Sequence, residues 1–123
     1  MSTILVVEDE PNVRKLVTVN LVQRGYRVLE AENGQQTWEH LHNQKPDLLI
    51  LDIKLPDLTG WDILDELDHI PNVPKDLPVV VMTATPVDQN SMLQKYPCIV
   101  EILVKPFNTG KLIMIVQEIL PIN

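Results

Sequence analysis

Cysteine is almost absent from this sequence of 123 residues, in which Cys98 is the only one. A single cysteine permits neither an internal disulfide nor a cysteine-based zinc cluster, and it favours the reducing cytoplasm as the location. For Cys98 itself we expect the role of a small buried hydrophobic residue rather than that of a redox sensor. No apolar run approaches the ~20 residues of a membrane span, and the first residues lack the basic segment of a signal peptide.

Positive charge is also scarce, because 10 lysines and arginines stand against 17 aspartates and glutamates, for a formal net charge of −7. A chain of this charge repels a phosphate backbone, so we expect neither nucleic acid nor a membrane as a direct partner. The apolar content of 45% and the charged content of 22% are ordinary for a globular domain. Since no repeat, linker or low-complexity tract divides the chain, we expect one domain over residues 1–123.

Five short apolar runs alternate with amphipathic segments. The runs cover residues 4–7, 26–31, 48–52, 79–82 and 99–104. Such continuous apolar runs are typical of strands buried on both faces of a parallel sheet. The alternation predicts an α/β fold with a doubly wound (βα)5 sheet, and right-handed crossovers would bring all strand carboxyl ends to one edge.

Start signals and apolar spacing predict the helices between these runs. Helices are expected to begin at Pro11, after Asn33-Gly34, after Gly60, at Val87, and at Asn108 or Thr109. In the first helix, the face expected to pack on the sheet carries Val13, Leu16, Val17 and Leu21. The three prolines between residues 71 and 78 predict a stiff loop.

Polar residues follow four of the five runs, and they suit one kind of chemistry. These residues are Glu8 and Asp9, then Asp52, Thr83 and Lys105. Carboxylates that converge within ~4–6 Å repel each other by on the order of 4 kcal/mol at an effective dielectric of 20, so the site needs a cation. All-oxygen ligands with room for water suit Mg²⁺. Asp52 projects alone from the central run and is the natural nucleophile toward phosphorus, with Mg²⁺, Lys105 and Thr83 to hold the phosphoryl oxygens.

These residues, taken together, resemble a known family. The stretches that carry the resemblance are Val6-Val7-Glu8-Asp9-Glu10, Leu51-Asp52 with Leu55-Pro56-Asp57 and Gly60, Met82-Thr83-Ala84, and Lys105-Pro106-Phe107. In this order and spacing they are similar to the response-regulator receiver domain of bacterial two-component systems, over essentially the whole chain. The resemblance implies a flavodoxin-like receiver fold with strand order 2-1-3-4-5. It also implies a signalling switch rather than an enzyme, although such a domain catalyses its own phosphorylation and dephosphorylation.

The resemblance further implies how the chemistry is divided. Asp52 would accept the phosphoryl group from a phosphohistidine of a sensor histidine kinase or phosphotransfer protein. Mg²⁺ would be held by Asp9 and Asp52, by Glu8 through water and by the backbone carbonyl of Lys54. Phosphorylation would then change the surface of the fourth helix, fifth strand and fifth helix, which would bind a downstream protein target.

The switch residues match the family in part. Thr83 would be the switch hydroxyl, beside Ala84, and Lys105 would precede a cis peptide bond to Pro106. Family members carry an aromatic residue three positions before the lysine, where this chain has Ile102, so the usual aromatic readout is not expected. The family's Gly-Ala before the fifth strand is replaced by Cys98-Ile99, which predicts a short or irregular fourth helix.

Alternatives to this interpretation exist for the function and for the assembly. A phosphorylation-independent interaction module remains as the second function, and a homodimer through apolar surface at Ile102, Ile113 and Met114 is a further expectation. A flavodoxin-like cofactor binder is disfavoured, because the acidic residues 8–10 would repel a phosphate group. The remaining conspicuous side chains are expected to take no part in the chemistry: His40, His42 and His69 are not candidate ligands, and Trp38 and Trp61 are packing residues.

Overall fold

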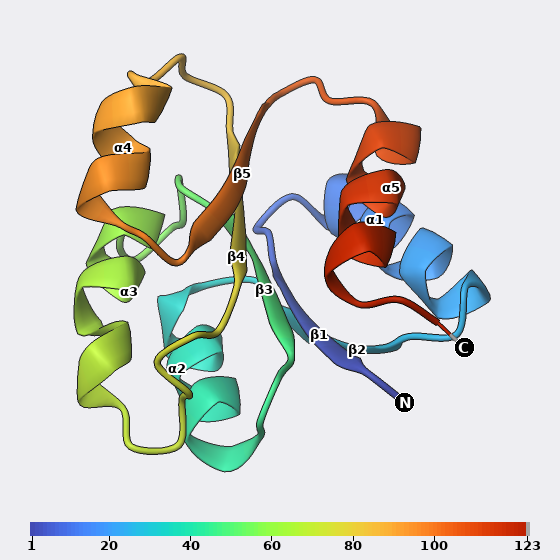
Figure 1. Cartoon of the computed structure of the whole chain (residues 1–123), viewed down its shortest axis with the longest axis horizontal. Coiled ribbons are helices and arrows are strands. Elements are labelled where there is room, and N and C mark those ends of the chain that lie inside the picture. The colour runs from blue at the N-terminus through green and yellow to red at the C-terminus, as the bar shows by residue number, and fades with distance from the viewer. Residues whose placement is uncertain (123) are drawn as a thin grey trace.

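The computed structural model describes residues 1–122 and contains one parallel sheet of five strands in the order β2-β1-β3-β4-β5 (Figure 1). The strands are β1 (Thr3–Val7), β2 (Arg27–Ala31), β3 (Leu48–Asp52), β4 (Val79–Thr83) and β5 (Ile99–Val104). They alternate with the helices α1 (Pro11–Gln23), α2 (Gly34–Asn43), α3 (Gly60–Glu66), α4 (Gln89–Lys95) and α5 (Thr109–Ile119), and the short 3-10 helix η1 (Leu67–His69) follows α3. This arrangement confirms the predicted fold class and strand order.

Helices cover both faces of the sheet: α1 and α5 lie on one face, and α2, α3 and α4 on the other (Figure 1). Successive side chains of a strand point to opposite faces. In β1, Leu5 and Val7 therefore join the core under α2 and α3, whereas Ile4 and Val6 join the core under α1 and α5. Because β1, β3 and β4 are buried along their whole length, these three strands form a rigid platform for the residues at their ends.

The helix ends follow from local sequence. Side chains of Asn33, Thr59, Asp88 and Asn108 accept hydrogen bonds from backbone N–H groups in the first turns of α2, α3, α4 and α5. Asn108, rather than Thr109, is thus the cap of the last helix. Gly25, with φ of +95°, ends α1, a backbone conformation that favours glycine.

Three apolar residues lie elsewhere than predicted. Leu16 of α1 is 50% exposed, because the helix contacts the core mainly through Val17 and Leu21, and Leu16 lies beside this narrow stripe. Ile102 and Ile113, expected at the surface, are both buried in the core. The apolar side chains that α4, β5 and α5 do expose are those of Leu93, Val100, Val104 and Met114.

The fourth helix is short, as predicted, and begins at Gln89 rather than Val87. None of its residues is buried, and it is fastened at its carboxyl end by Tyr96. The Tyr96 ring stacks on Trp61 of α3 at a centroid distance of 5.6 Å, and its hydroxyl donates to the Asp65 carboxylate at 2.8 Å. The carboxyl end of α4 is therefore pinned to α3.

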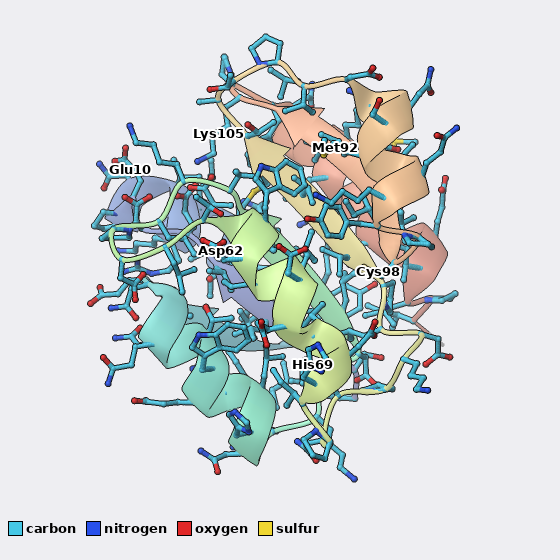
Figure 2. The ribbon with its side chains drawn as sticks, turned by 90° about the vertical axis from the view of Figure 1, so that its left-hand side faces the viewer. Glu10, Asp62, His69, Met92, Cys98 and Lys105 are labelled. Carbon is cyan, nitrogen blue, oxygen red and sulfur yellow. The ribbon has the colours of Figure 1, made fainter. Side chains whose placement is uncertain are left out.

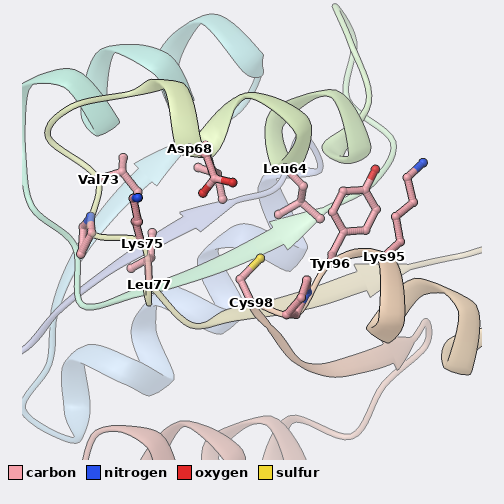
Figure 3. Close-up of a pocket in the computed structure, with 11 residues that line it drawn as sticks. Leu64, Asp68, Val73, Lys75, Leu77, Lys95, Tyr96 and Cys98 are labelled. Carbon is pink, nitrogen blue, oxygen red and sulfur yellow. The ribbon is translucent and has the colours of Figure 1, made fainter.

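Cys98 and His69 lie away from the acidic edge of the sheet. Figure 2 shows Lys105 and Glu10 at one end of the molecule and His69 toward the other. Cys98 is half-buried and lines a pocket of about 330 Å³ beside Leu77 and Tyr96 (Figure 3). Burial raises the pKa of the Cys98 thiol, which keeps it protonated at neutral pH.

Candidate functional site

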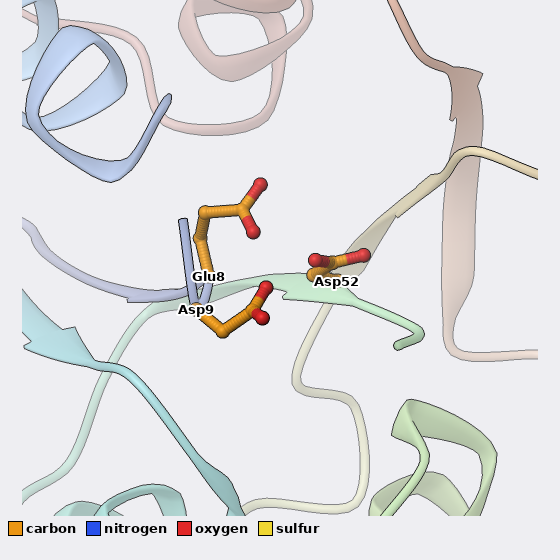
Figure 4. Close-up of side chains that lie close together, drawn as sticks. All are labelled: Glu8, Asp9 and Asp52. Carbon is orange, nitrogen blue, oxygen red and sulfur yellow. The ribbon is translucent and has the colours of Figure 1, made fainter. Parts of the chain in front are cut away.

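Three carboxylates meet where β1 and β3 end. Glu8, Asp9 and Asp52 each offer an oxygen, and these atoms lie within 4.8 Å of one another (Figure 4). Glu8 and Asp52 are buried, whereas Asp9 is exposed. The register explains the meeting, because Val7 pairs with Leu51 in the parallel ladder, so the residues that follow them, Glu8 and Asp52, lie side by side at this edge of the sheet. The cluster is open to solvent on the side of Asp9, from which an ion or a substrate could enter.

Lys105 extends from the end of β5 across this cluster. Its ammonium group forms ion pairs with Glu8 and, at 3.1 Å, with Oδ2 of Asp52. Lys105 follows β5, whose residue Val104 pairs with Thr83 of β4, so the sheet brings it to the same edge. The Lys105–Pro106 peptide bond is cis, as the resemblance implied.

The electrostatic balance of this cluster favours a cation. Burial, followed by the hydrogen bond with Asp52, raises the pKa of Glu8 from 4.5 to about 7. Burial alone would lower the pKa of Lys105, but its hydrogen bond with Glu8 and the charge of Asp52 outweigh that effect and raise it. One ammonium group thus faces three carboxylates, and a divalent ion would relieve the remaining repulsion.

Two charged residues for which the sequence predicted no role hold the loops of this site, although one of them, Asp57, belongs to a stretch that carries the family resemblance. The Arg14 guanidinium donates to the backbone carbonyl of Glu8 at 2.8 Å and lies 3.5 Å from Glu30. The Asp57 carboxylate accepts two backbone hydrogen bonds from the start of α2. Neither contact has a sequence signal, because each joins segments that only the fold brings together.

A glycine is required beside Asp52. A Cβ on Gly60 would approach the backbone carbonyl oxygen of Asp52 to 2.8 Å and the Cα of Ile53 to 3.0 Å. The Gly60 N–H donates to the Ile53 carbonyl at 2.7 Å. The start of α3 is therefore packed directly against the end of β3.

The family model of the response regulator receiver domain matches residues 4–117. The chain belongs to this family. The receiver domain is 32% identical over 118 residues to the phosphate regulon transcriptional regulatory protein PhoB of Pseudomonas aeruginosa, which covers 96% of the chain and 51% of PhoB. It is also 32% identical over 106 residues to the response regulator GtcR of Aneurinibacillus migulanus, covering 86% of the chain and 42% of GtcR. The chain thus spans about half the length of these curated relatives.

Solved structures agree with this membership. The response regulator TrrA of Thermotoga maritima, in complex with Mg²⁺ and BeF, superposes with a TM-score of 0.80 at 32% identity, covering 98% of this chain and all of that one (100%). The chemotaxis response regulator CheY4 of Vibrio cholerae gives a TM-score of 0.85 at 26% identity, with 98% and 99% of the two chains covered. These likenesses confirm a response regulator receiver domain of the two-component type.

The side chains of the remaining predicted residues form no hydrogen bond with this cluster. The buried Thr83 hydroxyl donates to the Thr85 carbonyl at 3.0 Å and accepts from the Thr85 N–H at 3.1 Å, so it is engaged within its own loop. Ala84 is exposed beside it. The backbone N–H of Lys54 donates to Oδ1 of Asp52 at 3.4 Å, and its side chain is exposed. Ile102 is buried in the core under α2 and α3.

Proposed function

We propose that this receiver domain is the phosphoacceptor of a two-component phosphorelay and that Asp52 receives the phosphoryl group. The single observation that carries the proposal is the position of the Asp52 carboxylate, which lies between two further carboxylates and the Lys105 ammonium. Asp52 is 3% exposed, so a nucleophile is held in one orientation at the bottom of a charged site. Membership in the family supports the same role.

The donor set also fits Mg²⁺. Three carboxylate oxygens within 4.8 Å are hard ligands that leave room for water, the set that Mg²⁺ prefers. Asp9, Asp52 and the Lys54 carbonyl would hold the ion directly, and Glu8 would do so through water. The bound ion supplies a positive charge that neutralises the phosphoryl oxygens. The solved TrrA structure with Mg²⁺ and BeF lends support, since the match covers 98% of this chain and 100% of TrrA at 32% identity.

In the transfer reaction, a carboxylate oxygen of Asp52 forms a bond to phosphorus while the bond from phosphorus to the donor histidine nitrogen breaks. The leaving imidazole takes up a proton, and the product is an acyl phosphate on Asp52. Lys105, already 3.1 Å from Oδ2, would move its hydrogen bond to a phosphoryl oxygen. Thr83 would exchange its bonds to Thr85 for another oxygen, which would draw the loop before α4 toward Asp52.

The partners follow from this chemistry. A sensor histidine kinase or phosphotransfer protein would supply the phosphoryl group, and a downstream protein would recognise the changed surface of α4, β5 and α5. We propose that a homodimer also uses this surface, through the exposed Leu93, Val100, Val104 and Met114. An equal sedimentation coefficient over a hundredfold range of concentration, with and without phosphorylation, would exclude the dimer.

Two further expectations remain predictions. We propose that the domain is a switch rather than an enzyme, since its own aspartate is consumed and then reset in each cycle. Within residues 1–122, no helix has the length and apolar character needed to cross a membrane. The cytoplasmic location stays a prediction from the sequence.

The test is the intact mass after incubation with acetyl phosphate, with and without Mg²⁺, for the wild type and Asp52→Ala. We expect a Mg²⁺-dependent gain of one phosphoryl group, roughly 80 Da, that the variant lacks. No gain in the wild type would favour the phosphorylation-independent interaction module instead.

A further inference from the structure

The loop that follows Asp52 is fastened to the start of α2 at two consecutive residues. Oδ1 of Asp57 accepts a hydrogen bond from the Gly34 N–H at 2.8 Å, and Oδ2 accepts one from the Gln35 N–H at 3.1 Å. Leu58, the next residue, fills the space left by the missing side chain of Gly34. A Cβ on Gly34 would lie 2.6 Å from both Cγ and Cδ2 of Leu58.

The chemistry of this contact is that of an anion bound at a helix N-terminus. The first N–H groups of a helix have no partner within the helix and carry the positive end of its dipole. In this chain they are paired with an internal carboxylate. The hydrogen bond from Gly34 is the largest cause that lowers the pKa of Asp57, so Asp57 is ionised at neutral pH and the contact is charge-assisted.

The anchor on the helix side is firm. The Asn33 side chain caps α2 by accepting from the Gln36 N–H at 2.8 Å. Thr37 and Leu41 of α2 are fully buried against the core. A loop that docks on the first turn of α2 is therefore held against the body of the domain.

The loop itself is short and closed at its base. The Gly60 N–H donates to the Ile53 carbonyl, and Lys54 pairs with Thr59 in an isolated bridge. Asp57 holds the tip, three residues after Lys54 and five after Asp52. With both base and tip held, the backbone at Lys54 has little freedom to turn.

We propose that Asp57 is a positioning residue for the metal site. By docking the loop on the start of α2, it fixes the Lys54 backbone carbonyl in the orientation needed to complete the ligand set of Asp9 and Asp52. The inference rests on the proposed function, since it assigns the Lys54 carbonyl to Mg²⁺. Without the tether, binding would have to order the loop as well, and part of the binding free energy would be lost to that ordering.

The experiment is a calorimetric titration of the full chain with Mg²⁺, comparing the wild type with Asp57→Asn and a matched control, Asp47→Asn. The Asp47 carboxylate also accepts a backbone hydrogen bond, from Thr3 at 2.8 Å, but it does so at the opposite edge of the sheet. Residues that position a metal ligand typically change the affinity by 10- to 100-fold. We expect the Mg²⁺ dissociation constant to rise about tenfold for Asp57→Asn and to stay within about twofold for Asp47→Asn.

Two further readouts separate positioning from general destabilisation. Urea unfolding in EDTA should show similar losses for both variants, whereas amide hydrogen exchange of residues 53–58 in EDTA should speed up in Asp57→Asn alone. Gly34→Ala should weaken Mg²⁺ binding although Asp57 is intact, because the added methyl group displaces Leu58. The double variant Gly34→Ala/Leu58→Ala restores the space and should recover the affinity.

The outcomes are distinguishable. The positioning role would be overturned if Asp57→Asn bound Mg²⁺ with wild-type affinity, or if Asp57→Asn and Asp47→Asn lost equal Mg²⁺ affinity. Either result would leave the proposed function standing. A wild type that binds no Mg²⁺, or that binds it unchanged after Asp52→Asn, would overturn the proposed function itself.

Discussion

Replacing Glu8 with glutamine should stabilise the metal-free domain at alkaline pH, and this gain should shrink as the pH falls. Glu8 is fully buried, and burial together with the hydrogen bond to Asp52 raises its pKa from 4.5 to about 7. The unfolded chain therefore releases the Glu8 proton at a lower pH than the folded chain does. The native state loses free energy of unfolding as the pH rises above about 5, and the loss is complete above about pH 8.

The expected magnitude follows from the two pKa values. The difference between about 7 and 4.5 is about 2.5 pKa units, which corresponds to about 3 kcal/mol at pH 8. At pH 5.5 the penalty is only about 1 kcal/mol, because Glu8 is still protonated in the folded state. The stability difference between Glu8→Gln and the wild type should thus grow by about 2 kcal/mol between pH 5.5 and pH 8. Glutamine keeps an oxygen that can accept a hydrogen bond from Lys105, so packing around the site is preserved.

The assay is urea unfolding in EDTA, followed by the fluorescence of Trp38 and Trp61, at four pH values from 5.5 to 8. Subtracting the wild type from the variant cancels all groups that titrate equally in both proteins. A variant no more stable than the wild type at pH 8 would refute the reasoning. A difference that does not change with pH would do the same, since it would come from packing rather than from ionisation.

Three other substitutions test the structure at separate places. Gly60→Ala forces a Cβ against the Asp52 carbonyl; it should lower the free energy of unfolding by about 1–3 kcal/mol and slow acetyl phosphate labelling, and normal labelling would contradict the close packing. Leu41→Ala, at a fully buried position of α2, should lower the free energy of unfolding in urea by about 2–5 kcal/mol. A loss under about 1 kcal/mol would mean that α2 does not pack on the core through Leu41. Tyr96→Phe removes the hydroxyl bonded to Asp65. It should lower the free energy of unfolding by about 1–3 kcal/mol and speed amide hydrogen exchange in α4, and unchanged exchange would show that α4 is held by other contacts.

Much of the fold could be predicted, because its signals are local. Buried parallel strands are continuous apolar runs, and helix starts carry Asn, Thr, Asp or Pro at fixed positions. The acidic edge was equally visible, since strand ends in such a sheet converge. The strand order, in contrast, was predicted from the family resemblance and not from the periodicity.

What could not be predicted depends on distances between remote segments. Leu16 has the helical spacing of a core residue, but only Val17 and Leu21 of α1 are buried, and Leu16 beside them is half exposed. Ile102 and Ile113 read as surface residues until β5 and α5 are placed against the core. The Asp57 tether joins residues 23 and 22 positions apart, and neither partner carries a pattern that names the other.

The charges at the site explain why a cation would bind first and a phosphoryl group second. Glu8, Asp9 and Asp52 carry up to three negative charges against the single positive charge of Lys105. Without a metal, the folded protein lowers this imbalance by raising the pKa of Glu8, so a proton occupies part of the site at neutral pH. A divalent ion would displace that proton and bring the balance near zero. Only then could Asp52 accept a phosphoryl group, which itself carries about −1.5 to −2 charges, without strong repulsion from Glu8 and Asp9, so metal binding would have to precede phosphorylation.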